Sequence, residues 1–459
     1  MEQGVLGLLA LVILWVALAA RIWCRGGALR RPDSPGAACQ RHAWRPRTPA
    51  DCPACRAAGD EPARIPSPIV RPWADVKGRR GAPKRVVTEG YACPAARCPY
   101  YGVTDSRLHA LVGYGHHGAT DRIQDFRCQA CGTKVSARRG TALYRLKTPP
   151  QRVGEVLSAL AEGLDVAAAV RVFGHGEGTI ARWQARAARH ADRLHARLLR
   201  GLHLPHLQLD EIRTRLRSRG AVLWLWLALD PLTKLVPVVH LGPRTQASAH
   251  AIIHALHDRL APGCVPIVTS DGLRLYFYAL TAHFGRWVAA GRRRVWHVAD
   301  TLVYGQVKKT YRRRRLVRVA HRVVVGTPER LRVALRALGL SGRLNTAFVE
   351  RVNLTLRQNV AALRRRTWST AQTGSGLRCQ VAWWRGYYHF IRPHQALRLA
   401  LPAPQARGGG REPRRYRTRT PAMAAGLTTR RWSTREFLSR PSGWSPDDLG
   451  PQVVGAGHP

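Results

Sequence analysis

The chain has 459 residues, 45% of them hydrophobic, and its 75 Lys and Arg against 27 Asp and Glu give a formal charge of +48. This length and hydrophobic content exclude a chain without a core and predict two or three domains. So many positive charges repel one another unless a polyanion is near, and we therefore expect nucleic acid as the partner. Nearly all of the positive charge is Arg, but Arg enrichment also follows from a GC-rich genome, so this bias carries no information of its own.

An uncharged apolar run covers residues 4–20. Its length is at the short limit of a membrane-spanning helix, and the Arg residues that follow it would keep the rest of the chain in the cytoplasm. We therefore interpret residues 1–30 as a membrane anchor, with residues 4–20 in contact with the inner membrane. A mis-assigned start codon is the second interpretation. A cleaved signal peptide is the third, although the positive charge that should precede it is absent.

Residues 31–90 are rich in Pro, Arg and Ala, and we expect them to be mostly linker. Seven of the ten Cys residues of the chain lie between Cys39 and Cys131. In a basic, intracellular chain such close Cys pairs indicate metal sites more than disulfides. A small zinc knuckle and loose thiols in the linker are equally good interpretations of the first group, which contains Cys39, His42, Cys52 and Cys55.

A second group of cysteines lies in residues 91–147. Its members form the pairs Cys93-x4-Cys98 and Cys128-x2-Cys131. Two thiolate pairs on two turns supply the four ligands that a tetrahedral zinc ion needs. The spacing therefore predicts a zinc ribbon with a structural Zn²⁺, although an x4 pair is less common than an x2 pair.

Residues 148–200 show helical periodicity. We expect a helix over 151–164, a second helix that Asp165 caps and that runs to Phe173, a turn over 174–178 and an Arg-rich helix from Thr179. This pattern predicts a helix-turn-helix with its last helix in the major groove of double-stranded DNA. The alternative is an ordinary helical hairpin with its Arg residues in solvent. The DNA contacts that we predict here are Thr179, Arg182, Trp183 and Arg186.

Residues 201–400 change to strands whose ends carry acids. We expect a short strand ending at Asp210, an apolar strand over 222–229, a third strand, an amphipathic helix and a strand leading into Asp271. This order predicts a mixed α/β domain. Residues 286–322 are strongly basic and predict an inserted ribbon or loop with a nucleic-acid face. The contacts that we predict there are Lys308, Lys309, Arg312 and Arg313.

A helix around residues 344–363 places Glu350, Asn353 and Arg357 on one face. Together with Asp210 and Asp271, Glu350 would form a carboxylate cluster. Two carboxylates at 4 Å repel by roughly 4 kcal/mol, so such a cluster needs a cation. Oxygen ligands suit Mg²⁺ or Mn²⁺, and two such ions would support attack on a phosphodiester. Farther along, core packing is favoured over base stacking for Trp383, Trp384, Tyr387 and Tyr388.

These residues resemble the DDE transposases of bacterial insertion sequences. The matching segments are Leu209-Asp210-Glu211, Thr269-Ser-Asp271-Gly272 and the helix from Asn345 through Glu350 and Asn353 to Arg357. The resemblance covers about residues 91–397 and implies a multidomain α/β chain: zinc ribbon, helix-turn-helix and a ribonuclease-H-like catalytic domain at 201–400. It implies a homo-oligomer that acts on the element ends and the target DNA in the cytoplasm. It implies that two Mg²⁺ or Mn²⁺ ions bind to the catalytic Asp210, Asp271 and Glu350, which Asn353 and Arg357 support.

Two features depart from the family pattern. The interval between Asp271 and Glu350 is longer than in compact integrases, which makes Asp300 the alternative third acid, although it lacks the helical Asn and Arg. The apolar run at 4–20 is not part of the pattern either, so a catalytically inactive DNA-binding regulator, with or without a membrane anchor, is the second functional hypothesis. From about residue 401 to 459, Pro, Gly, Arg and Ser dominate and predict a disordered tail.

Overall fold

The computed structural model describes residues 71–76, 86–118, 121–217, 222–313, 315–365, 367–406 and 412–442. The apolar run at 4–20 lies outside these residues, as does the first group of zinc-type ligands, Cys39, His42, Cys52 and Cys55. Within the part of the chain that the structure describes, no helix is both long enough and apolar enough to cross a membrane.

The cysteine-rich part forms a small antiparallel sheet. After the short helix α3 (Trp73–Val76), the strands β1 (Leu111–His117), β2 (Ile123–Cys128) and β3 (Lys134–Ser136) pair in the order β1-β2-β3. Its core holds few apolar side chains, mainly Tyr100, Leu111, Phe126 and Val135, packed around buried cysteines. So small a core needs an additional staple to be stable.

The three helices expected over 148–200 are present as α4 (Pro150–Ala161), α5 (Val166–Phe173) and α6 (Glu177–Leu198). As expected, Asp165 caps α5: its side chain accepts a hydrogen bond of 2.7 Å from the backbone N–H of Ala168. Gly174 ends α5 in the left-handed conformation, with φ of 70°. One face of α6 is buried against the long helix α11 (Gly374–Phe390).

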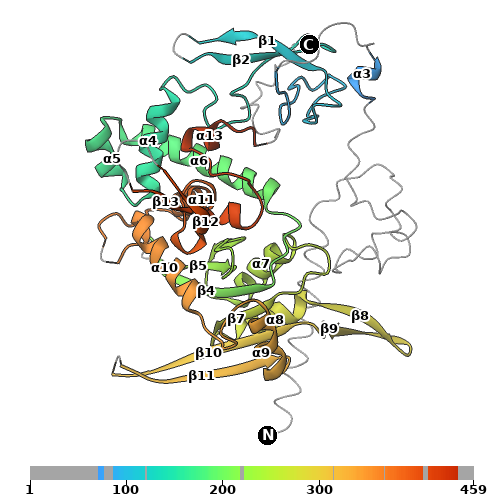
Figure 1. Cartoon of the computed structure of the whole chain (residues 1–459), viewed down its shortest axis with the longest axis vertical. Coiled ribbons are helices and arrows are strands. Elements are labelled where there is room, and N and C mark those ends of the chain that lie inside the picture. The colour runs from blue at the N-terminus through green and yellow to red at the C-terminus, as the bar shows by residue number, and fades with distance from the viewer. Residues whose placement is uncertain are drawn as a thin grey trace, which may run out of the picture. The chain divides into compact units, whose positions relative to one another are not determined.

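A six-stranded mixed sheet forms the centre of residues 201–400 (Figure 1). Its strand order is β11-β10-β7-β4-β5-β6. The strands β4, β5 and β6 pair antiparallel, β7 is parallel to β4, β10 is parallel to β7, and β11 returns antiparallel to β10. Their bounds are β4 (His206–Arg215), β5 (Val222–Leu229), β6 (Val239–Gly242), β7 (Ile267–Asp271), β10 (Val303–Arg312) and β11 (Arg315–Val325).

Helices cover both faces of this sheet. On one face Trp226 and Ala228 of β5 pack with α7 (Gln246–His257) and α8 (Leu275–His283). On the other face Leu225 and Leu227 pack with α10 (Ala347–Asn359) and α11. Because successive side chains of a strand point to opposite faces, a strand covered on both sides is apolar throughout, as β5 is. The mixed α/β fold predicted for this part of the chain is confirmed.

The sequence predicted that the basic residues 286–322 form one inserted ribbon or loop. This prediction is wrong for the part that forms strand β10. The residues form one ribbon of β8 (Gly285–Ala290) and β9 (Arg293–Val298), and then β10 with β11. Strand β10 belongs to the central sheet, where Val307 is the partner of Asp271 in the parallel ladder. The first half of β10 is buried, and its positive charge begins only at Lys308. The average composition of residues 286–322 therefore did not indicate that they contain a core strand.

The disorder predicted for residues 401–459 is also wrong for the described parts of this segment, residues 401–406 and 412–442. This segment forms β12 (Leu399–Gln405), β13 (Arg414–Arg417), α12 (Pro421–Ala424) and α13 (Thr434–Ser439). Phe437 is fully buried between α4, α6 and α11, and the Trp432 ring stacks on Phe390 with ring centroids 4.6 Å apart. A few well-spaced apolar residues thus anchor a segment whose average composition is that of a disordered chain.

We expect the substitution Phe437→Ala to lower the free energy of unfolding by about 3–5 kcal/mol, because it empties a fully buried site. Denaturant unfolding followed by far-UV circular dichroism measures this change. Leu399→Ala is the matched control, since Leu399 is 45% exposed in the same segment. Equal small losses in both variants would show that the segment does not pack in solution.

Two buried histidines predict acid instability. Burial lowers the pKa of His190 and of His206 to about 4 in the folded chain, against 6.5 in the unfolded chain. The unfolded chain therefore takes up protons first, so the stability is complete above pH 6.5 and falls as the pH drops towards 4, by roughly 3 kcal/mol for each histidine. We expect His190→Gln to flatten this pH dependence of the melting temperature, and the exposed His203→Gln to leave it unchanged. An equal slope in both variants would contradict the assignment.

Candidate functional site

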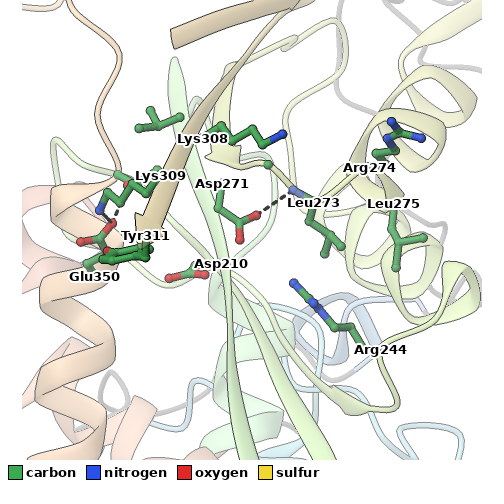
Figure 2. Close-up of a pocket in the computed structure, with 13 residues that line it drawn as sticks. Asp210, Arg244, Asp271, Leu273, Arg274, Leu275, Lys308, Lys309, Tyr311 and Glu350 are labelled. Atoms are coloured by element: carbon green, nitrogen blue, oxygen red, sulfur yellow. Dashed lines mark hydrogen bonds and ion pairs between the residues drawn. The ribbon is translucent and has the colours of Figure 1, made fainter. Parts of the chain in front are cut away.

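A cavity of about 710 Å³ opens where β7, β10 and α10 come together. Asp210, Asp271 and Glu350 line it, and so do the basic side chains of Arg244, Lys308, Lys309 and Arg274. Figure 2 shows Asp210 and Asp271 at the centre of this cavity, with Glu350 on the α10 side and Arg244 on the opposite side. Three acids that are far apart in sequence thus line one cavity, but Glu350 is not in the group of carboxylates that lie within 4.8 Å of one another.

The sheet explains how Asp210 and Asp271 come to be neighbours. Asp271 is the last residue of β7, as expected, but Asp210 lies in the middle of β4 and not at its end. The parallel pairing of β4 with β7 stops at Leu209 and Ser270, while β4 continues to pair with β5 as far as Arg215. Asp210 and Asp271 are therefore the first residues beyond the point where the two strands separate.

Asp210 is held in place by two hydrogen bonds. Asn353 Nδ2 donates to its Oδ2 at 2.7 Å, and the backbone N–H of Glu211 donates to its Oδ1 at 2.9 Å. Burial raises the pKa of Asp210 to about 7, and the negative charges of Glu211, Asp271 and Glu350 add to this rise. The cavity is therefore a crowded acidic site whose ionised form needs a nearby cation.

Glu211, the residue after Asp210, is a further acid of this cavity region, and its role was not predicted from the sequence. One carboxylate oxygen from each of Asp210, Glu211 and Asp271 lies within 4.8 Å of the others, a grouping that could hold a metal ion. Both oxygens of Glu211 already have partners, since Arg244 Nε donates to Oε1 at 2.9 Å and the Tyr276 hydroxyl donates to Oε2 at 3.1 Å. Burial raises the pKa of Glu211, and Asp271 adds to the rise, whereas the Arg244 interactions oppose it.

Glu350 lies in the first turn of α10 and faces the same cavity. Its Oε1 accepts hydrogen bonds from Lys309 Nζ and, at 2.6 Å, from the Thr346 hydroxyl. The alternative third acid, Asp300, does not line the cavity: its side chain is 82% exposed, and its ion-pair partner is His297 at 3.9 Å. The structure therefore places Glu350 at the acidic site and leaves Asp300 out.

The two predicted supporting residues lie on the same helix. Asn353 is 5% exposed and its amide contacts Asp210 directly, as described above. Arg357 follows one turn later on this face, and Asp210 is close enough to oppose the lowering of the Arg357 pKa by burial. The helix that was predicted to carry Glu350, Asn353 and Arg357 is therefore present as α10.

Two of the DNA contacts predicted on α6 are wrong. Trp183 is 4% exposed and belongs to the helical core, because it shares a face with Ile180 and Ala187. Arg186 Nε donates to the carbonyl of Ala142 at 3.0 Å, so its side chain connects α6 to the segment before α4 within the fold. Arg182 remains exposed and Thr179 partly exposed at the start of α6.

The basic residues predicted on the β10–β11 ribbon are mostly accessible. Lys308, Arg312 and Arg313 are exposed, whereas Lys309 is paired with Glu350. The aromatic residues of α11 behave differently: Trp383, Trp384 and Tyr388 are buried, which agrees with the core role favoured for them. Tyr387 packs partly buried against the same helical core.

The four cysteines of residues 91–147 converge on one point. Their Sγ atoms all lie within 4.8 Å of one another, with Cys93 and Cys131 at 3.4 Å and Cys98 and Cys128 at 3.7 Å. A tetrahedral ion with Zn–S bonds of about 2.3 Å would separate two sulfurs by about 3.8 Å, so the set fits zinc. Gly132 directly after the last ligand has φ of 75°, a conformation that favours glycine.

Burial and crowding shape the chemistry of these thiols. Burial raises the pKa of Cys98 to about 11, and hydrogen bonds and charges among the cysteines add to the rise. At Cys131 burial acts in the same direction, but hydrogen bonds with Thr133, Cys93 and Cys98 outweigh it and lower the pKa to about 6. Four thiols this close cannot all ionise without a cation, which is the situation of a structural metal site.

Comparison with known proteins adds no family assignment. No protein-family model matches the chain, and no curated protein matches it.

Proposed function

We propose that this protein is a DNA transposase of the DDE type, which cuts and joins DNA strands at the ends of an insertion element. One observation carries the proposal: Asp210 and Asp271 meet where two parallel strands separate, and α10 brings Asn353 into contact with Asp210 and Glu350 to the wall of the same cavity. The ribonuclease-H-like catalytic domain, the helix-turn-helix and the zinc ribbon belong to the same proposal. The mixed sheet and the cysteine cluster support it.

The acidic cavity is the proposed site of Mg²⁺ or Mn²⁺. Asp210 and Asp271 would hold the ions, and the hydrogen bond from Asn353 fixes the position of the Asp210 carboxylate. Bound ions of this kind activate water or a 3′-hydroxyl and stabilise the leaving oxygen of a phosphodiester. Lys308 and Arg244 on the cavity wall would position the negatively charged backbone.

Glu350 is our choice for the third carboxylate, ahead of Glu211. The two oxygens of Glu211 are held by Arg244 and Tyr276, and removing these partners would leave buried groups unsatisfied. Glu350 is paired instead with Lys309, which is partly exposed. An incoming DNA phosphate can take over this lysine, which would free the Glu350 carboxylate for the metal.

The DNA surface is proposed from the charge distribution. The exposed basic side chains of the β10–β11 ribbon continue from the acidic cavity, because Lys308 lies one residue beyond Val307, the partner of Asp271. Arg182 at the start of α6 is a second candidate contact. We propose that the active form is a homo-oligomer on double-stranded DNA in the cytoplasm, and the membrane contact through residues 4–20 stays a prediction.

Strand cleavage tests this function. The purified full chain is incubated with Mn²⁺ and DNA that carries the inverted repeats flanking the gene, and nicks are mapped at single-nucleotide resolution. We expect metal-dependent nicking at the repeat ends, reduced about 100-fold or more by Glu350→Gln, since a metal ligand contributes several kcal/mol. Asp300→Asn is the matched control for loss of an acid and should cleave normally.

Each other outcome has a definite meaning. Tight binding to the repeats without cleavage by any variant would contradict the enzyme and leave the DNA-binding regulator. Loss of cleavage in Glu211→Gln together with normal cleavage in Glu350→Gln would make Glu211 the third ligand. Normal cleavage by Glu350→Gln and loss in Asp300→Asn would overturn the site as described.

A further inference from the structure

A second cavity, of about 410 Å³, lies between the β5–β6 edge of the sheet and the helices α6 and α11. It shares no lining residue with the acidic cavity. One part of its wall is apolar, formed by Leu225, Val239, Leu241, Val381 and Ala382. The other part is polar and carries Asp192, His240, Arg259, Arg378 and Arg385.

The polar wall has more positive than negative charge. Three arginines face one carboxylate, Asp192, which leaves an excess of two positive charges. Arg385 is 4% exposed, and its nearest carboxylate atom, on Asp192, is 3.9 Å away on a side chain that is itself 53% exposed. A buried guanidinium without a close counter-ion is strongly unfavourable.

The other two arginines have few acidic partners. Arg259 Nη1 donates to two backbone carbonyls, those of His195 at 3.2 Å and Leu199 at 3.4 Å. Within the described residues, the Arg378 side chain is exposed and makes neither a hydrogen bond nor an ion pair. Asp192 is thus shared by all three arginines, Asp258 acts on Arg259 as well, and Arg378 has no ion pair of its own among these residues, so the cavity lining keeps more positive than negative charge.

Arg385 ends a chain of hydrogen-bonding groups that also contains His195, His389 and the backbone N–H of Val236. This chain has more N–H donors than acceptors. The backbone N–H of Val236 donates to His389 Nε2 at 3.0 Å, so neutral His389 carries its proton on Nδ1 and donates to His195 Nε2 at 3.1 Å. His195 must then carry its own proton on Nδ1, the atom that Arg385 Nε approaches at 3.2 Å. Both histidines are fully buried, and burial lowers the pKa of each, which keeps them neutral. His195 therefore cannot accept a hydrogen bond from Arg385, and an acceptor inside the cavity would form a more favourable hydrogen bond with this guanidinium group.

We propose that this cavity binds a phosphomonoester of mononucleotide size. A phosphate dianion matches the excess of two charges, and guanidinium groups bind phosphate oxygens through paired hydrogen bonds. The apolar wall opposite the arginines provides the surface for the organic part of the ligand, and the volume lies in the usual range of small-molecule sites. Free nucleotides and the 5′-phosphorylated end of a DNA strand both carry this group.

Binding of adenosine monophosphate to the full chain tests the proposal by isothermal titration calorimetry at constant ionic strength. The control must remove an equal charge, because so basic a protein attracts anions everywhere. We expect Arg378→Gln to weaken binding about tenfold or more, and Arg330→Gln, on the exposed side of α9 (Pro328–Ala337), to leave it unchanged. Adenosine, which lacks the phosphate, should bind much more weakly than adenosine monophosphate.

The variant Arg385→Met separates a binding role from a structural one. It removes the buried charge at similar volume, so we expect binding to be lost while the melting temperature without ligand stays the same or rises. A 5′-phosphorylated oligonucleotide that binds more tightly than the same oligonucleotide with a 5′-hydroxyl, by a margin that is lost in Arg378→Gln, would identify a DNA end as the source of the phosphate. Equal affinity in the wild type and Arg378→Gln, or equal affinity for adenosine, would overturn the proposal. Cleavage at the acidic site should be unchanged in Arg378→Gln without added nucleotide, so this site and the proposed function fail separately.

Discussion

Asp210→Asn is expected to reduce strand cleavage by about 1,000-fold or more and, in the absence of metal, to make the protein more stable. The loss of activity follows because Asp210 is the proposed metal ligand at the centre of the acidic cavity, and each loss of about 1.36 kcal/mol in transition-state stabilisation lowers the rate tenfold. The gain in stability follows because three further carboxylates crowd Asp210. Removing its charge relieves their repulsion.

The size of the stability gain in Asp210→Asn depends on pH. Because the folded chain holds the Asp210 proton up to about pH 7 whereas the unfolded chain releases it near 3.8, ionisation destabilises the fold progressively as the pH rises between these values. At about pH 8 this corresponds to roughly 4 kcal/mol, and we expect Asn, which accepts one hydrogen bond fewer, to recover about half of it. Near pH 4 the variant and the wild type should be equally stable.

Thermal unfolding in chelator and in Mn²⁺ measures this effect. In chelator at about pH 8 the variant should melt at the higher temperature, and added Mn²⁺ should stabilise the wild type more than the variant. Asp300→Asn is again the control, since its exposed carboxylate is outside the cavity. A variant less stable than the wild type in chelator would show that Asp210 has a structural role and that the acids are not crowded as described.

Removal of zinc is expected to unfold the sheet of β1, β2 and β3. A structural zinc contributes about 10–16 kcal/mol in small metal-dependent domains, and the apolar core around Phe126 is too small to replace it. We expect Cys128→Ser to lose one equivalent of zinc and to become open to proteolysis between residues 86 and 137. Metal content by atomic absorption and mapping of the cleaved fragments measure these two effects.

Cys379→Ser is the matched control for the zinc prediction, because Cys379 is a partly buried cysteine on α11, away from the cluster. It should keep both its zinc and its resistance to proteases. The total zinc content also tests the first group of ligands: two equivalents in the wild type and one in Cys128→Ser would support a second site at Cys39, His42, Cys52 and Cys55. A zinc-free wild type with an intact, protease-resistant sheet would contradict the metal site.

Local patterns predicted the helices α4, α5, α6, α7 and α10 and the strands β4, β5 and β7. The capping Asp165 and the spacing of Glu350, Asn353 and Arg357 depend on neighbours within one or two turns, so the sequence contains what is needed to identify them. The sequence could not predict which residues of β5 face which side of the sheet, because a strand that is covered on both sides has no polar face. The mixed sheet was nevertheless predictable from the order of its elements.

The errors share a physical cause, which is that partners distant in sequence decide burial. Trp183 looks like a DNA contact on an Arg-rich helix, but α11 covers the face on which it lies. Strand β10 looks like part of a basic insertion until its pairing with β7 is known. The role of Glu211 was hidden for the same reason, because Arg244 and Tyr276, which hold it, come from other elements.

The way the C-terminal segment closes the helical core has a consequence for synthesis of the chain. The backbone N–H of Ala142 donates to the carbonyl of Leu438, and His190 contacts the carbonyl of Phe437, so the core around α4 and α6 is completed by residues that follow the whole central sheet in the sequence. The helices leave the ribosome with the apolar face around Ile180 and Trp183 uncovered while the whole central sheet is still being synthesised. Residues 148–200 are therefore not a module that folds ahead of the rest, and a nascent chain of this protein exposes this apolar face until α13 has been made.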